Sequence, residues 1–162
     1  MNKQIHAEAV GYLYKQPIVL DDTMALHNFV AAIGSNKTLV TDLTIKGWGR
    51  GRGTHKAMNF CAFTLLAGCT NLQRLNLDCG IGYAPTAKGI ARQIYRDGCY
   101  FLEAFGAARE KKDAALDVLE LVDCNIGRVH TRPLAGPFIN MAEQQDFRAD
   151  FNTEMRRLLG CK

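Results

Sequence analysis

The chain has 162 residues, of which 48% are hydrophobic and 22% charged, so it can bury a core and is not a disordered tail or linker. No apolar run approaches the roughly 20 residues that span a bilayer, and Met1 to Val10 lacks the apolar core of a signal peptide. We therefore expect one domain over residues 1–162, intracellular, cytoplasmic or nuclear, with no membrane contact.

Charge and cysteine content add two constraints. The net charge is +4, but residues 47–100 carry +5 and residues 101–127 carry −3, a distribution that favours anionic partners for the first block. Because no export signal is visible, the six cysteines are expected to be free thiols in a reducing compartment rather than three disulfides.

The N-terminal part of the chain predicts two helices. Ile5, Val10 and Leu13 follow helical spacing until Pro17 ends the pattern, and a short apolar run covers residues 18–20. A second helix begins after Asp21 and Asp22, carries an apolar stripe from Leu26 to Ile33, and ends at Gly34.

Three strand-like segments then share one pattern: apolar, two residues, apolar, one residue, apolar. They are Val40, Leu43 and Ile45; Leu72, Leu75 and Leu77; and Leu116, Leu119 and Leu121. Helical stretches over residues 54–67 and 86–112 separate them. Since strands joined by helical crossovers pair in parallel, we expect an α/β fold of parallel strands with the helices on one face.

A strand of the form L-x-x-L-x-L followed by a helix is typical of leucine-rich repeats. The spacings here are 32 and 44 residues, longer than the usual 20–29. The pattern therefore favours a short leucine-rich-repeat-like arrangement, and an ordinary α/β sandwich of three or four strands explains it equally well. After a turn-rich stretch, an amphipathic C-terminal helix presents Phe147, Phe151, Met155 and Leu158, a candidate interface for the sheet edge or a second copy of the chain.

A loose pattern links residues 4–9 (Gln-Ile-His-Ala-Glu-Ala), Leu13-Tyr14, residues 26–29 (Leu-His-Asn-Phe) and residues 39–45. They follow the order R-Q-I-x-x-E-A-x-x-x-L-Y, then a helix, then a strand. In this pattern the first half of the chain resembles a group of uncharacterised fungal F-box-like proteins. It implies a leucine-rich-repeat-like recognition fold with a binding role and no enzyme activity. The F-box segment itself would lie ahead of Gln4, so the resemblance covers only the recognition part.

A glycine-rich stretch, residues 47–54, joins a predicted strand to a predicted helix, which is where phosphate-binding loops occur. It contains Trp48, Arg50 and Arg52 but matches neither the Walker A pattern nor the dinucleotide fingerprint. The arginines form a cationic loop that pairs with phosphate or carboxylate groups, or else a plain surface loop. Trp48 is either a stacking residue or a core anchor.

Five further basic residues extend this candidate binding surface: His55, Lys56, Lys88, Arg92 and Arg96. The last three are four residues apart and lie on one helix face. They form either a surface that follows nucleic-acid phosphates or a solvated helix face.

No metal, cofactor or catalytic signature is present. The sequence has no C-x-x-C or H-x-x-x-H pair, and Asp78 and Asp123 end equivalent predicted strands without an associated nucleophile. We therefore expect a non-enzymatic protein-binding module, with a homodimer as one form. Its expected contact surfaces are the open strand face, the loop from Trp48 to Gly53 and the C-terminal helix. The alternative is a nucleic-acid-binding protein, and an enzyme acting on a phosphorylated small molecule is the least favoured class.

Overall fold

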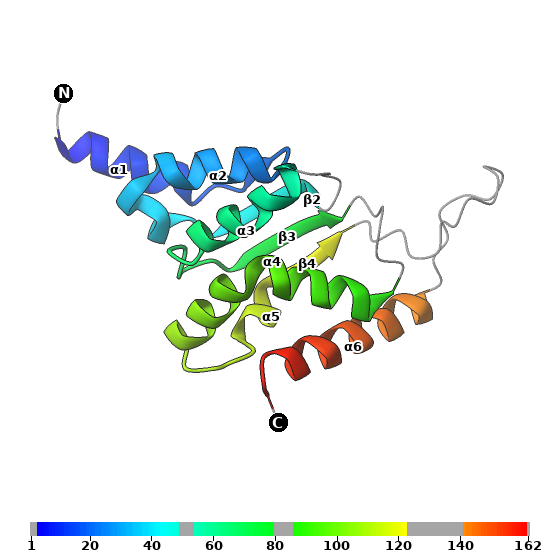
Figure 1. Ribbon diagram of the computed structural model, residues 1–162. Coiled ribbons are helices and arrows are strands. Elements are labelled where there is room, and N and C mark those ends of the chain that lie inside the picture. Colours follow the sequence, from blue (N-terminus) through cyan, green and yellow to red (C-terminus); the bar gives the residue numbers. More distant parts are fainter. Residues whose placement is uncertain (1–2, 49–53, 80–85, 123–140, 162) are drawn as a thin grey trace.

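The structure is a computed structural model that describes residues 3–48, 54–79, 86–122 and 141–161 (Figure 1). The elements follow in the order α1 (Lys3–Tyr14), β1 (Ile18–Leu20), α2 (Thr23–Ala32), the 3-10 helix η1 (Gly34–Leu39), β2 (Asp42–Trp48), α3 (Thr54–Leu66), β3 (Arg74–Cys79), α4 (Ala87–Ala108), α5 (Ala114–Val118), β4 (Leu119–Val122) and α6 (Met141–Leu158). Strands and helices alternate through most of this order, which confirms the expected α/β class.

The sheet has four parallel strands in the order β1-β2-β3-β4. Each crossover therefore moves one strand in the same direction, and right-handed crossovers of this kind place all their helices on one face. In Figure 1, α2, α3 and α4 accordingly succeed one another in the same order as the strands. The helices form one layer and the sheet forms the other.

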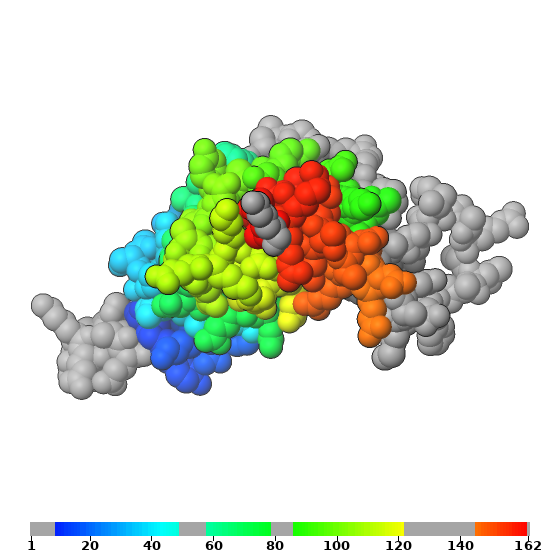
Figure 2. All heavy atoms as spheres, turned by 90° about the horizontal axis from the view of Figure 1, so that it is seen from below, coloured from blue at the N-terminus to red at the C-terminus, as the bar shows by residue number. Residues whose placement is uncertain are grey.

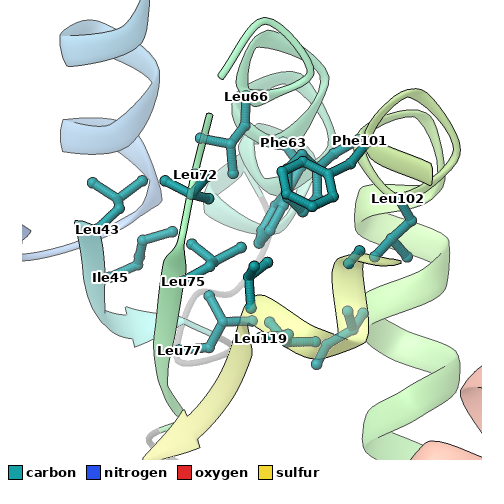
Figure 3. Close-up of a cluster of buried hydrophobic side chains, with 14 of the residues drawn as sticks. Leu43, Ile45, Phe63, Leu66, Leu72, Leu75, Leu77, Phe101, Leu102 and Leu119 are labelled. Atoms are coloured by element: carbon teal, nitrogen blue, oxygen red, sulfur yellow. The ribbon is translucent and has the colours of Figure 1, made fainter. Parts of the chain in front are cut away.

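Along the strands, buried residues alternate with less buried ones, because in a two-layer arrangement only one face of the sheet is covered by helices. Leu43, Ile45, Leu75, Leu77 and Leu119 are buried, and they lie in register across β2, β3 and β4. Their side chains meet Phe63 and Leu66 of α3 and Phe101 and Leu102 of α4 in the core drawn in Figure 3.

Helix α2 begins and ends as its sequence predicts. The Asp22 side chain accepts a hydrogen bond of 2.7 Å from the Ala25 backbone N–H and caps α2 at its N-terminus. At the other end, Gly34 has a φ of +55°, the left-handed conformation typical of the residue after a helix C-cap.

The long helix α4 bends at Gly98, which has non-helical backbone angles. A Cβ atom at this position would lie 3.3 Å from the Phe63 ring, so the absence of a side chain lets α4 approach α3 closely. Phe101 and Phe105 follow the bend with ring centroids 5.5 Å apart, and Phe101 also packs against Phe63. In the region where the sequence predicts a helix, the buried apolar stripe of α4 consists of Ile90, Ile94, Phe101, Leu102 and Phe105.

Two expectations need correction. Residues 18–20 form a fourth strand, β1, which three residues are too few to reveal by alternation. Leu116, expected in the third repeat strand, lies in the short helix α5, and β4 begins only at Leu119. The kinship with leucine-rich repeats remains a prediction.

Candidate interaction surface

The predicted cationic loop lies largely outside the described residues. This applies to Arg50 and Arg52 and to the side chains of His55 and Lys56, although the last two belong to α3. Trp48, the last residue of β2, is only 3% exposed and belongs to the hydrophobic core. The prediction of Trp48 as a binding-surface residue is therefore wrong, and the core alternative holds.

The predicted basic stripe of α4 is exposed, but two of its three members already bind carboxylates. Arg92 donates a 2.8 Å hydrogen bond from Nε to Glu154 of α6. Arg96 donates from Nε to Asp97 at 3.0 Å. Lys88 is exposed at the start of the helix. The stripe is therefore partly neutralised, which reduces its attraction for phosphate groups.

The apolar stripe of α6 packs against its own chain. Phe151 and Met155 are 3% and 0% exposed and belong to the core, and Phe147 and Leu158 pack against that core while partly buried. Figure 2 shows α6, in orange and red, lying along the green and yellow-green surface of α4 and α5. The sequence-based prediction that this stripe packs on the sheet edge or on a second copy is therefore corrected: the stripe is buried against helices of its own chain.

Charged contacts reinforce this intramolecular position of α6. Glu154 accepts hydrogen bonds from Arg157 at 2.7 and 2.8 Å and from Arg92, and these lower its pKa from 4.5 to about 2. Arg156 donates to Asp113 at 3.0 Å, and this bond also lowers the pKa of Asp113. The Glu154–Arg92 pair joins α6 to α4, and the Arg156–Asp113 pair joins α6 to the residue that precedes α5.

The described residues offer little for nucleophilic or metal chemistry. Burial raises the pKa of the Cys69 thiol to about 11, so this thiol stays protonated at neutral pH. Within the described ranges, no group of three or more His, Cys, Asp or Glu side chains is placed to hold a metal ion. Asp78 lies within β3, one residue before the strand ends at Cys79, whereas Asp123 lies outside the described residues, so their predicted pairing has no structural account.

The structure identifies the residues of the open strand face that the sequence analysis expects as a contact surface. The strand residues that alternate with the core residues share the sheet face opposite the helices. We call this surface the open sheet face, and it consists of Val19, Asp42, Thr44, Lys46, Arg74, Asn76, Asp78 and Glu120. Val19, Lys46, Arg74 and Glu120 are exposed and the other four are partly buried. In the sequence, this face is indicated by the alternation of polar with apolar residues in each strand.

Several side chains of the open sheet face are held in place by one another. Asn76 donates from Nδ2 to the Thr44 hydroxyl at 3.0 Å across neighbouring strands. Arg74 and Asp42 form an ion pair of 3.3 Å across the same two strands. These contacts fix side chains on a rigid sheet, so the face is pre-organised for a partner.

Comparison with protein-family models, with curated proteins and with solved structures finds no match. Among the helices that the structure describes, none is both long enough and apolar enough to cross a membrane. The function of this chain is therefore inferred from its own geometry.

Proposed function

We propose that this chain is a non-enzymatic, intracellular protein-binding module and that the open sheet face is its binding surface. The observation that carries the proposal is the asymmetry of the sheet. One face is sealed by helices, while the other presents mostly polar side chains, of which Lys46, Arg74 and Glu120 are exposed. The four cysteines whose side chains the structure describes are free thiols, which supports a reducing compartment.

A parallel sheet normally has both faces covered. An α/β arrangement whose helices all lie on one side leaves the other face to solvent, and solenoid proteins use faces of this kind to bind partners. The side chains on such a face stand about 4.8 Å apart across the strands, on the most rigid part of the molecule. Protein recognition on a pre-organised surface of this type requires no movement of the backbone.

Nucleic acid receives less support as the partner. The exposed arginines of the α4 stripe are engaged by Glu154 and Asp97, so a phosphate would have to displace a carboxylate at each. On the open sheet face, Asp78 and Glu120 have no ion-pair partner among the described residues, and their carboxylates repel a phosphate backbone.

The proposal is tested by selecting ligands for the full chain from a displayed library of random peptides. Each enriched peptide is then measured by fluorescence anisotropy against wild type, Thr44→Arg and Thr153→Arg. Thr44 lies at the centre of the open sheet face, and Thr153 is an exposed residue of α6, so the second variant is a matched control. We expect Thr44→Arg to weaken binding about tenfold or more through the added bulk, and Thr153→Arg to have no effect.

Two results would contradict the proposal. One is an equal affinity of selected peptides for wild type and Thr44→Arg, measured on proteins with the same urea midpoint as their controls. The other is salt-sensitive binding of short labelled DNA or RNA that is lost in the double variant Arg92→Ala and Arg96→Ala. The latter would assign the function to the helix stripe.

A further inference from the structure

One row of side chains crosses the whole open sheet face. Val19 of β1 is in register with Thr44 of β2, Thr44 with Asn76 of β3, and Asn76 with Glu120 of β4. The row changes in character along its length from an aliphatic group to a hydroxyl, an amide and a carboxylate. Its two ends are exposed, with Val19 at 53%. A partner that lies along this row therefore meets an apolar end and an acidic end.

The charges of the face are balanced at one end and unbalanced at the other. Asp42 is paired with Arg74, and Lys46 is paired with Asp21 at 3.8 Å. Asp78 and Glu120, which lie on the adjacent strands β3 and β4, have no ion-pair partner among the described residues. Within the described part of the chain, the β3–β4 side of the face thus presents two carboxylates without an ion-pair partner.

Asn76 neighbours both carboxylates, because it is in register with Glu120 and lies two residues before Asp78 on β3. Its Nδ2 donates to Thr44 and its Oδ1 is buried, so the acceptors that this side offers to a partner are the two carboxylates. Charge complementarity favours a partner that brings N–H donors and positive charge to this side.

We propose that the partner of the open sheet face is an extended basic peptide segment that crosses the strands, with an apolar side chain near Val19 and a lysine or arginine near Glu120 and Asp78. This inference rests on the proposed function, because it names the chemistry of the partner for the same surface.

The spacing of the row sets the spacing of the two anchor residues. Three inter-strand steps of about 4.8 Å separate β1 from β4, which gives about 14 Å in all. An extended peptide rises about 3.4 Å per residue and presents alternate side chains on the same side. Residues i and i+4 of such a peptide are about 14 Å apart and face the sheet together, with residue i+2 above Thr44 and Asn76. The apolar and basic anchors are thus expected four positions apart, in either chain direction.

The test uses the peptides selected above on the full chain, now examined for sequence. We expect enrichment of Lys or Arg four positions from Leu, Ile, Val or an aromatic residue. The affinity of a synthetic labelled peptide with this pattern is then measured against wild type, Glu120→Gln, Glu120→Arg and the control Glu103→Arg. Glu103 is an exposed glutamate of α4, away from the sheet face, so this control makes the same change in net charge.

We expect Glu120→Arg to weaken binding about tenfold, because an attractive contact becomes repulsive, and Glu120→Gln to weaken it less. Replacing the basic residue of the peptide by Glu is expected to reverse the preference in favour of Glu120→Arg. Glu103→Arg is expected to bind as wild type does, at the same salt concentration.

The outcomes separate the two proposals. Selected peptides without a basic residue, or equal effects of Glu120→Arg and Glu103→Arg, overturn the basic-segment inference. If Thr44→Arg still abolishes binding in that case, the open sheet face remains the binding surface. If Thr44→Arg has no effect either, both proposals are overturned. A library that yields no ligand for the full chain also counts against the basic segment.

Discussion

Glu154 is the residue on which the polar contact between α6 and α4 depends. Its side chain is 6% exposed and binds Arg92 of α4 and Arg157 of its own helix. A carboxylate this enclosed is costly unless its charge is compensated, and the two guanidinium groups compensate it by direct hydrogen bonds. Because Glu154 binds Arg92, this arginine is not a free cation. The sequence alone, which places Arg92 on an exposed helix face, does not show this pairing.

The low pKa of Glu154 makes a prediction about stability in acid. Because its pKa falls from 4.5 in the unfolded reference to about 2 in the folded chain, its contribution is complete above pH 4.5 and is lost as the pH falls toward 2. We expect Glu154→Gln to lower the free energy of unfolding at pH 7, with the difference from wild type shrinking between pH 4.5 and pH 2. Urea denaturation at pH 7, 4 and 3 measures this.

The control for this experiment is Glu103→Gln, which alters an exposed glutamate of α4. This variant is expected to follow wild type at every pH. A difference between Glu154→Gln and wild type that stays constant from pH 7 to pH 3 would show that the Glu154 carboxylate contributes through its shape and packing rather than its charge.

At the scale of elements, the turn after α4 depends on a glycine. Gly106 lies in the last turn of the helix, and its carbonyl accepts a hydrogen bond of 3.0 Å from the Lys111 N–H. A Cβ atom on Gly106 would lie 2.9 Å from the Lys112 carbonyl oxygen and 3.1 Å from that of Lys111. Both obstacles are backbone atoms, so the chain could accept a side chain here only by moving the turn that leads into α5.

We therefore expect Gly106→Ala to destabilise the fold by about 1–3 kcal/mol, although alanine is the better helix former. Gly11→Ala in α1 is the matched control, because a Cβ there meets nothing within 4 Å. That variant is expected to be neutral or to gain about 0.5–1 kcal/mol. Urea midpoints of the two variants measure the contrast, and a stabilising effect of Gly106→Ala would contradict the close approach.

Elements with strong local signals were predictable from the sequence, and those with weak signals were not. The apolar stripe of α4 and the capping residues of α2 specify their helices through interactions within a few residues of the chain. The prediction of a strand at Leu116 was wrong because an apolar residue three positions before Leu119 fits either a strand pattern or a single helical turn. An open strand face was expected, but the row of residues that crosses its four strands could not be predicted, because it exists only once the register is known.

At the scale of the whole molecule, α6 packs on a surface that could not be predicted from the sequence. Its periodicity identifies which side chains are buried but not which surface buries them, since the edge of the sheet, a second copy and another helix all satisfy the same stripe. The structure selects α4 and α5, where Phe151 and Met155 complete the core and Arg156 binds Asp113. A helix remote in sequence thereby becomes part of the same hydrophobic cluster as the sheet.

This arrangement predicts how the molecule responds to the loss of one buried ring. Phe151→Ala removes a side chain that is 3% exposed, so we expect the free energy of unfolding to fall by about 3–5 kcal/mol. Phe60→Ala is the control, because Phe60 is 41% exposed and mainly loses its edge contact with Tyr100, worth about 1 kcal/mol. Since α6 packs on its own chain, Phe151→Ala is expected to leave the mass measured by light scattering unchanged across protein concentrations. A fall in that mass with little loss of unfolding free energy would instead mean that the stripe of α6 joins two copies of the chain.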